Sequence, residues 1–292
     1  MQIDGVFSGG GIKGFAYVGA LQVLEEKNFT FKRVAGTSAG AIFACLIAAG
    51  YSASEVEEML DDLNLKSLLD PPKPARTLPF LKWINLYFRM GLYKGKALEK
   101  LFYRKLAAKG VVTFNDLPRG SLKLIASDLT NGKMVVIPDD LQKYGFEWRK
   151  FPVSKALRMS CGIPFFFEPI KLHDNKGECV FVDGGVLSNF PLWVFHQNKE
   201  RPILGFKLSH PGEEMEPRKI ANGLDLFDAL FKTMKTAHDE RYISRKHEKS
   251  IVFIPVENVS STQFDIDEEM KQQLIDIGRK KTMKFLETWD CS

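Results

Sequence analysis

A glycine-flanked serine near the start of the chain has the residue types that acyl transfer requires. Residues 36–40 read GTSAG, and Ser38 lies between Gly36 and Gly40. The pattern G-x-S-x-G is typical of a nucleophile elbow, a tight strand-to-helix turn that presents a serine hydroxyl at a helix N-terminus. The pattern alone is weak, but here an apolar strand precedes it and an apolar helix follows it. We therefore take Ser38 as a candidate nucleophile.

A run of glycines at residues 9–14, GGGIKG, permits two interpretations. The spacing of Gly9, Gly11 and Gly14 matches the G-x-G-x-x-G loop that binds the phosphates of a dinucleotide. That loop also requires an acidic residue about 20 residues further on, at the end of the second strand, where this sequence has none. A Walker phosphate loop is excluded because Lys13 precedes the last glycine and no Ser or Thr follows it.

The same glycine loop suits an oxyanion hole, the second half of an acyl-transfer site. A serine that attacks an ester needs hydrogen-bond donors aimed at the developing oxyanion, and backbone N–H groups at a helix N-terminus supply them. If the first two predicted strands are neighbours in a sheet, residues 9–11 lie beside Ser38. A glycine turn followed by a helix-capping serine is the plain structural alternative.

Ser38 needs a base, and the sequence favours Asp183 over any histidine. Asp183 ends an apolar strand and is followed by Gly184 and Gly185, and open parallel sheets place functional groups at the carboxyl ends of their strands. Desolvation and a direct hydrogen bond to the serine would make this carboxylate an effective base. An Asp-Gly turn is the plain alternative, and a serine–acid–histidine triad also fits the spacing. The histidines are His173, His196, His210, His238 and His247.

Alternating strands and helices must position these groups. The pattern predicts an α/β fold with a mostly parallel central sheet covered on both faces. Asn131 and Gly132 suit the tight turn of a hairpin between two of the strands. We expect strands at residues 3–7, 31–35, 122–127, 133–137, 179–182, 203–208 and 251–255, and helices at 15–24, 39–49, 224–246 and 267–289.

Residues 70–110 interrupt this alternation and predict an insertion that acts as a lid or faces a membrane. Prolines exclude both helix and central strand from residues 70–79. In the following segment, Lys82, Asn85 and Arg89 form a narrow polar stripe on an otherwise apolar helix, which suits core packing or a membrane surface. A basic helix comes next, and its charges favour the membrane interpretation. These charges are Lys94, Lys96, Lys100, Arg104, Lys105 and Lys109.

Composition narrows the class of protein. With 292 residues and 45% hydrophobic content, we expect a single domain over residues 1–292. The net charge of +5 is compatible with anionic membranes or nucleic acid, and also with ordinary surface charge. The four cysteines lack a metal-binding spacing, so we expect reduced thiols and no metal ion. No signal peptide is evident, and the longest apolar run, residues 39–50, is too short to span a bilayer. These features predict a cytoplasmic protein that can contact the inner face of the membrane peripherally.

Four motifs in order resemble those of the patatin-like phospholipase family. They are GGGIKG at 9–14, GTSAG at 36–40, SCGIPFFFEP at 160–169 and DGG at 183–185 with SNFP after it, and the resemblance spans residues 3–210. It implies a three-layer α/β/α sandwich and a Ser–Asp dyad without histidine, with Ser38 as nucleophile and Asp183 as base. It also implies an oxyanion hole formed by the amides of Gly10 and Gly11 together with Gly9 or Ile12. The supporting motif residues are Lys13, which stands where many members carry arginine, Gly14, Gly36, Gly40, Gly184 and Gly185.

The activity that this resemblance implies is hydrolysis of the acyl ester of a phospholipid or lysophospholipid. The reaction would pass through an acyl-enzyme and would need neither a metal ion nor a cofactor. The expected partners are an acyl-ester lipid and a membrane surface, and nucleic acid is not expected. Two alternatives stay open: acyl transfer to an acceptor other than water, and a lipid- or nucleotide-binding module without turnover.

Overall fold

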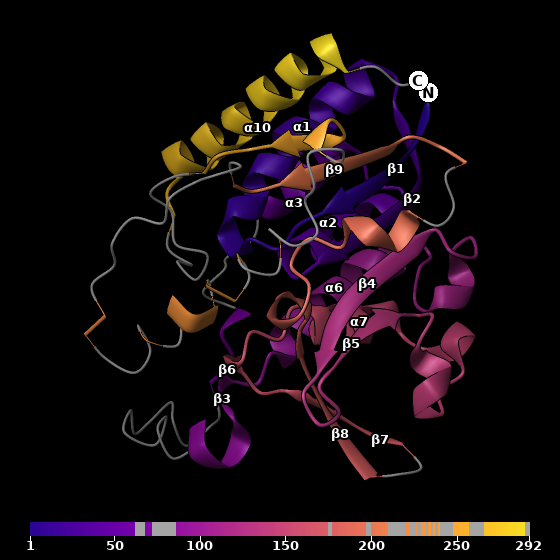
Figure 1. Ribbon diagram of the computed structural model, residues 1–292, viewed down its shortest axis with the longest axis vertical. Coiled ribbons are helices and arrows are strands. Elements are labelled where there is room, and N and C mark those ends of the chain that lie inside the picture. Colours follow the sequence, from indigo (N-terminus) through magenta and orange to yellow (C-terminus); the bar gives the residue numbers. More distant parts are fainter. Residues whose placement is uncertain are drawn as a thin grey trace.

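The computed structural model has a central sheet flanked by helices (Figure 1). It describes residues 1–61, 68–71, 86–174, 177–196, 200–209, 248–256 and 266–289, with a few further positions between 220 and 239. In this part of the chain an eight-stranded sheet has the order β10-β9-β1-β2-β4-β8-β7, and β5 also pairs with β4. The strands are β1 (Gln2–Phe7), β2 (Thr30–Thr37), β4 (Leu122–Asp128), β5 (Lys133–Ile137), β7 (Ile170–Asp174), β8 (Gly177–Asp183), β9 (Ile203–Lys207) and β10 (Ile251–Phe253).

Parallel pairing dominates the middle of the sheet, as predicted. The strands β10, β9, β1, β2 and β4 are parallel neighbours, whereas β5, β7 and β8 run antiparallel to their partners. The predicted hairpin joins β4 to β5, and Gly132 in its turn has a φ of 62°. One assumption of the sequence argument is wrong, because Asp183 ends a strand that runs antiparallel to its neighbour β4.

Helical segments cover both faces of the sheet and confirm the three-layer α/β/α sandwich. Successive side chains of a strand face opposite layers. Phe7 and Val34 join the large core with α1 and α2, whereas Val6 and Ala35 pack against residues 190–195 on the other face. The helices are α1 (Ala16–Glu26), α2 (Ala39–Ala48), α3 (Ala53–Asp61), α6 (Lys96–Ala108), α7 (Val153–Ser160) and α10 (Glu268–Thr288).

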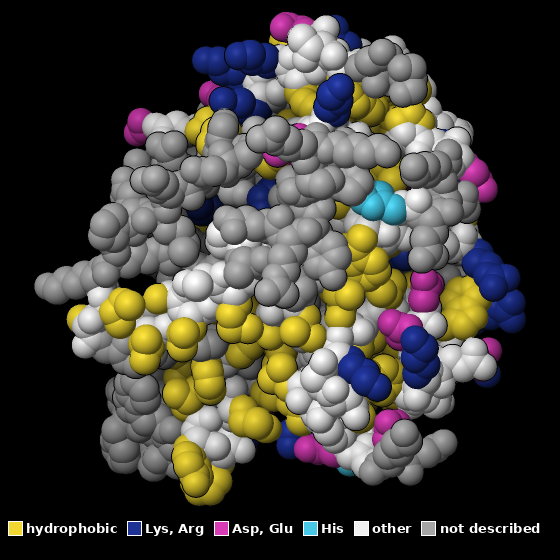
Figure 2. All heavy atoms as spheres, in the orientation of Figure 1, with side chains coloured by type: hydrophobic (Ala, Val, Ile, Leu, Met, Phe, Trp, Pro, Cys, Tyr) yellow, Lys and Arg dark blue, Asp and Glu magenta, His cyan; other side chains and the backbone are white. Residues whose placement is uncertain are grey.

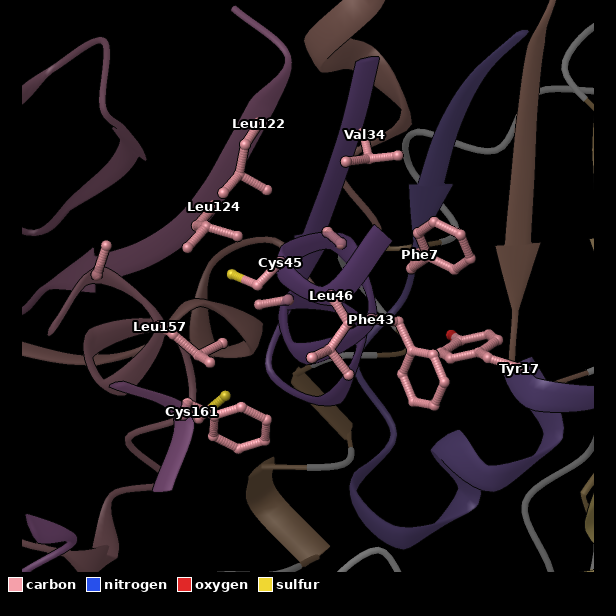
Figure 3. Packing of buried hydrophobic residues seen from close by; sticks show 14 of the residues in the cluster. Phe7, Tyr17, Val34, Phe43, Cys45, Leu46, Leu122, Leu124, Leu157 and Cys161 are labelled. Atoms are coloured by element: carbon pink, nitrogen blue, oxygen red, sulfur yellow. The ribbon is translucent and has the colours of Figure 1, made fainter. Parts of the chain in front are cut away.

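The helix α2 begins directly after the candidate nucleophile and is enclosed by other elements. Its Phe43, Cys45 and Leu46 are buried, and Figure 3 shows them between Tyr17 on one side and Leu157 on the other. Such enclosure is expected for a helix that is apolar on nearly every side. The packing fixes the start of α2, and therefore the serine turn, in the frame of the sheet.

Several elements of the structure are absent from the sequence prediction. The strand β3 (Gly91–Tyr93) pairs in parallel with β6 (Phe165–Phe167) in a separate two-stranded sheet. These strands, with β7, α3 and α7, are too short for their periodicity to be read from the sequence. The basic helix is confirmed as α6.

The predicted apolar helix before α6 lies partly outside the described residues, because 72–85 are not among them. Its described end, residues 86–89, is helical and stops at Met90, which has a φ of 58°. The predicted helix at 224–246 also falls mostly outside, although its described positions from 226 to 239 are helical. Among the residues described, no helix has the length and apolar character needed to cross a bilayer.

Candidate active site

Ser38 occupies the turn between β2 and α2 in a strained backbone conformation. Its φ is 55° and its ψ is −123°, a combination rare for a residue other than glycine. The turn is also tight, because a Cβ atom placed on Gly40 would lie 2.2 Å from the carbonyl oxygen of Phe7. A Cβ atom on Gly36 would lie 2.2 Å from the carbonyl oxygen of Gly40. This geometry is that of a nucleophile elbow.

Two residues at the end of α7 hold the backbone of Ser38 from both sides. The Ser38 N–H donates to Ser160 Oγ at 3.1 Å, and the Cys161 thiol donates to the Ser38 carbonyl oxygen at 3.1 Å. Ser160 is fully buried, and Cys161 is nearly so. In the sequence these residues stood out only as part of a motif, and their role as a clamp on the serine turn is visible only in the structure.

The glycine loop lies beside Ser38, as the sequence analysis expected if the first two strands were neighbours. The strands β1 and β2 are parallel neighbours, with Phe7 paired to Gly36, so the residues after each strand meet at one edge. A Cβ atom on Gly9 would lie 3.1 Å from the Cβ atom of Ser38 and 2.5 Å from Asn189 Oδ1. Gly9 is therefore the loop residue packed against Ser38.

The rest of the loop turns from β1 into α1. Residues Gly11–Phe15 form a 3-10 turn, in which Gly11 has a φ of 58° and Ile12 is buried. Lys13 Nζ donates to the carbonyl oxygen of Val256 at 2.6 Å, a contact that ties the loop to the chain after β10. This bond gives the Lys13 side chain a role in anchoring the loop. Gly14 packs against Phe43 of α2.

Asp183 and Ser38 lie on opposite sides of β4, at nearly the same position along that strand. Thr37, the residue before Ser38, pairs with Ile125, and Asp183 pairs with the next residue of β4, Ala126. Two strand spacings therefore separate their main chains, about 10 Å. Although β8 is antiparallel to β4, it ends beside the same part of β4 as β2 does.

The Asp183 carboxylate is fully buried at this position. Its Oδ1 accepts the Gly185 N–H at 2.7 Å, and its own N–H donates to the Gly162 carbonyl oxygen at 2.8 Å. The Gly162 bond links β8 to the segment that clamps Ser38. Gly184 packs on β4, where an added Cβ atom would lie 2.3 Å from the Ile125 carbonyl oxygen.

Cys161 lies in the electrostatic field of Asp183 as well as against Ser38. Burial raises the pKa of the Cys161 thiol well above its ordinary value, and the negative charge of Asp183 raises it further. The side chain therefore stays a neutral thiol that can donate to the Ser38 carbonyl oxygen. This coupling links the clamp to the candidate base.

His173 and His196 are the two histidines among the described residues, and both belong to elements other than the serine turn. His173 lies on β7 with its side chain 75% exposed, and its Nε2 is 3.9 Å from Glu178 Oε2. His196 follows the 3-10 turn Leu192–Phe195 and is half-buried. The other three, His210, His238 and His247, fall outside the described residues. No cluster of three His, Cys, Asp or Glu side chains with metal-binding geometry occurs within the described ranges.

The structure adds a buried cation that sequence analysis did not identify. The Arg158 side chain donates to the carbonyl oxygens of Gly95 at 3.1 Å, Lys94 at 3.0 Å and Glu168 at 2.6 Å. It thereby ties α7, which carries the serine clamp, to the small sheet of β3 and β6. A charged residue on a helix of eight residues gives no sequence signal of burial, so its role emerges only in three dimensions.

The chain is similar to several known proteins in sequence and in fold. A sequence profile of patatin-like phospholipases matches residues 5–196. The uncharacterized protein YqhO of Bacillus subtilis (strain 168) is 52% identical over 290 residues, 99% of both chains. The "Probable lipid hydrolase 463L" of Invertebrate iridescent virus 6 is 26% identical over 208 residues, 67% of this chain and 65% of the viral protein. The crystal structure of VipD from Legionella pneumophila shares the fold, with a TM-score of 0.57 and 17% identity over 98% of this chain and 67% of VipD. This chain is a member of the patatin-like phospholipase family.

Proposed function

We propose that this protein is a lipid acyl hydrolase in which Ser38 and Asp183 form a catalytic dyad. The proposal depends on one observation: three structural features lie together where the strands β1, β2 and β8 end. These features are a serine in a strained elbow, a glycine loop packed against it and a buried carboxylate at the same level across β4. The similarity to a viral protein named as a probable lipid hydrolase supports the same chemistry.

The proposed reaction has two steps. Asp183 takes the hydroxyl proton of Ser38 as the oxygen attacks the ester carbonyl carbon, and the amides of Gly10 and Gly11, with Gly9 or Ile12, stabilise the oxyanion. Asp183 gives this proton to the alcohol as the alcohol leaves, and the acyl group remains on Ser38. A water molecule then loses a proton to Asp183 and attacks the acyl carbon, and Asp183 returns this proton to the Ser38 oxygen as the fatty acid is released.

We further propose that the substrate is a phospholipid or lysophospholipid in a membrane, reached through an exposed aromatic patch. The patch comprises Tyr87, Phe88 and Phe165, residues that are 81%, 75% and 46% exposed. Phe165 begins β6, four residues after Cys161, so the patch is linked directly to the serine clamp. Figure 2 shows hydrophobic side chains gathered on the lower half of this face, where Figure 1 draws β3 and β6. Exposed aromatic rings of this kind suit the boundary between lipid head groups and acyl chains.

Covalent labelling tests the assignment of the nucleophile. A fluorophosphonate probe should label the wild-type protein at Ser38, as mapped by mass spectrometry, and Ser38→Ala should abolish the label. Ser188→Ala is a matched control, because Ser188 is a buried serine of the same sheet edge that the proposal does not use. Labelling that persists in Ser38→Ala, or no labelling of the wild type, would refute the nucleophile assignment.

The products decide between hydrolysis and transfer. The wild-type protein should release free fatty acid from a phospholipid even when an acceptor lysolipid is added in excess. Acylation of the added lysolipid in place of fatty-acid release would show the acyltransferase alternative with the same dyad.

A further inference from the structure

Three buried polar side chains form a chain of contacts behind the glycine loop. Lys207 Nζ lies 2.5 Å from Asp239 Oδ2, and Asn189 Nδ2 donates to the same oxygen at 3.2 Å. Lys207 is 8% exposed, Asp239 6% and Asn189 7%. Burial of an ion pair carries a large desolvation cost, and an apolar pair of similar volume is often as stable. We therefore expect this cluster to contribute to function, in addition to any contribution to stability.

Asn189 connects this cluster to the loop beside the nucleophile. Its carbonyl oxygen accepts the Gly9 N–H at 3.0 Å. Its side-chain Oδ1 also lies against Gly9, since a Cβ atom there would approach it to 2.5 Å. Gly9 is in turn the residue packed on Ser38, so Asn189 holds the loop by both its main chain and its side chain.

The charge on Asp239 determines which way the Asn189 amide points. A carboxylate only accepts hydrogen bonds, so it must face Nδ2, and the amide oxygen must then face Gly9. Lys207 completes the arrangement by balancing the buried negative charge and fixing Asp239 in place. Among the described residues, Asn189 Oδ1 has no conventional hydrogen-bond donor, as expected if it is held against the Cα of Gly9.

We propose that Asn189 and Asp239 are positioning residues that hold the glycine loop in place for an oxyanion beside Ser38. This inference rests on the proposed hydrolase activity. Asp239 lies beyond residues 5–196, the part matched by the family profile. A residue outside the range matched by the family profile would therefore take part in supporting the site.

Two double variants that differ in whether residue 239 can accept a hydrogen bond test the proposal. Lys207→Met with Asp239→Asn removes both charges but keeps an oxygen that can accept from Asn189. Lys207→Met with Asp239→Leu removes the charges and that oxygen together. Because both lose the ion pair, any effect of the pair on stability is common to them, and a difference between them reports the hydrogen bond to Asn189.

We expect the leucine variant to lower kcat for a p-nitrophenyl acyl ester about 10- to 100-fold with KM little changed, since small displacements of catalytic groups cost this much. The asparagine variant should stay within about threefold of the wild type. Amide hydrogen exchange of the peptide spanning residues 6–15 should be faster in the leucine variant than in the asparagine variant. Equal exchange and equal kcat in the two variants would overturn the proposal.

Hydrogen exchange also tests the positioning role independently of whether the protein is a hydrolase. If the wild type turns over no ester, the proposed function fails, while the exchange rates still decide whether Asp239 holds the loop. Should a double variant not fold, Asn189→Ala provides a second test that leaves the Lys207–Asp239 pair intact. It should speed exchange in the same peptide, and unchanged exchange there would contradict the positioning role.

Discussion

The backbone of Ser38 is strained, and the buried hydroxyl of Ser160 accepts its N–H. Ser160→Ala should leave that buried N–H without its acceptor, at a cost of about 1–3 kcal/mol in the free energy of unfolding. It should also lower kcat by about 10-fold or more, because the nucleophile turn loses a constraint. Urea unfolding and ester turnover measure the two effects.

Cys161→Ser is the control for this change, because a serine hydroxyl can still donate to the Ser38 carbonyl oxygen. It should retain most of the turnover of the wild type. Full kcat in Ser160→Ala would show that the clamp does not position the nucleophile.

The residues of the candidate site could be proposed from the sequence, whereas the contacts that support them could not. Ser38, Asp183 and the glycine loop stood out because each lies in a short motif with a chemical reason for its spacing. The clamp by Ser160 and the contacts of Asn189 with Gly9 join residues that are 122 and 180 positions apart. No periodicity or local motif encodes such pairs, so they require the fold.

Among the helices, α1 and α10 cross closely enough to exclude a side chain. A Cβ atom on Gly278 would lie 1.8 Å from the Ala16 carbonyl oxygen, which is main chain and cannot rotate away. Gly278→Ala should therefore lower the free energy of unfolding by about 1–3 kcal/mol or more, through separation of the two helices. Gln273→Ala, at an exposed position of α10, should change it by less than about 0.5 kcal/mol. Equal stability of these two variants in urea unfolding would contradict the observed crossing.

At the scale of elements, long periodic segments were predictable and short ones were not. The strands β1, β2 and β4 and the helices α2 and α10 follow from apolar runs or helical spacing. The direction of β8 could not be predicted, because an apolar strand reads the same whether its neighbour is parallel or antiparallel. Asp183 lies at the end of that antiparallel strand, so the reason given for its placement was wrong, and its role as the base stays a prediction.

The exposed aromatic patch predicts how the whole molecule meets a lipid surface. Replacing Tyr87 and Phe88 with serine should weaken binding to anionic phospholipid vesicles by about 10-fold or more, because these side chains would no longer bury apolar area in the bilayer. Met283→Ser is the control, since Met283 is exposed on α10, which Figure 1 shows at the opposite end of the molecule from β3. Vesicle sedimentation measures both. Equal binding by the double variant and the wild type would remove the patch from the proposed membrane contact.

Buried thiols make the stability of the whole molecule sensitive to alkaline pH. Burial raises the pKa values of Cys45 and Cys161, so the folded protein keeps protons that the unfolded chain loses above about pH 8.5. The free energy of unfolding should therefore fall as pH rises from there, by up to about 1.4 kcal/mol per pH unit for each thiol. Cys45→Ala should reduce this slope, as measured by urea unfolding between pH 7.5 and 9.5. A slope identical to that of the wild type would contradict the protonated, buried state of Cys45.

Release of fatty acid from phospholipid vesicles tests the central claim most directly. The wild-type protein should release free fatty acid, and Ser38→Ala and Asp183→Asn should each reduce the rate by about 10³-fold or more while unfolding at nearly the wild-type temperature. His173→Ala and His196→Ala should retain the wild-type rate. Full activity in Asp183→Asn, together with loss of activity in a histidine variant, would contradict the dyad and show a triad in its place.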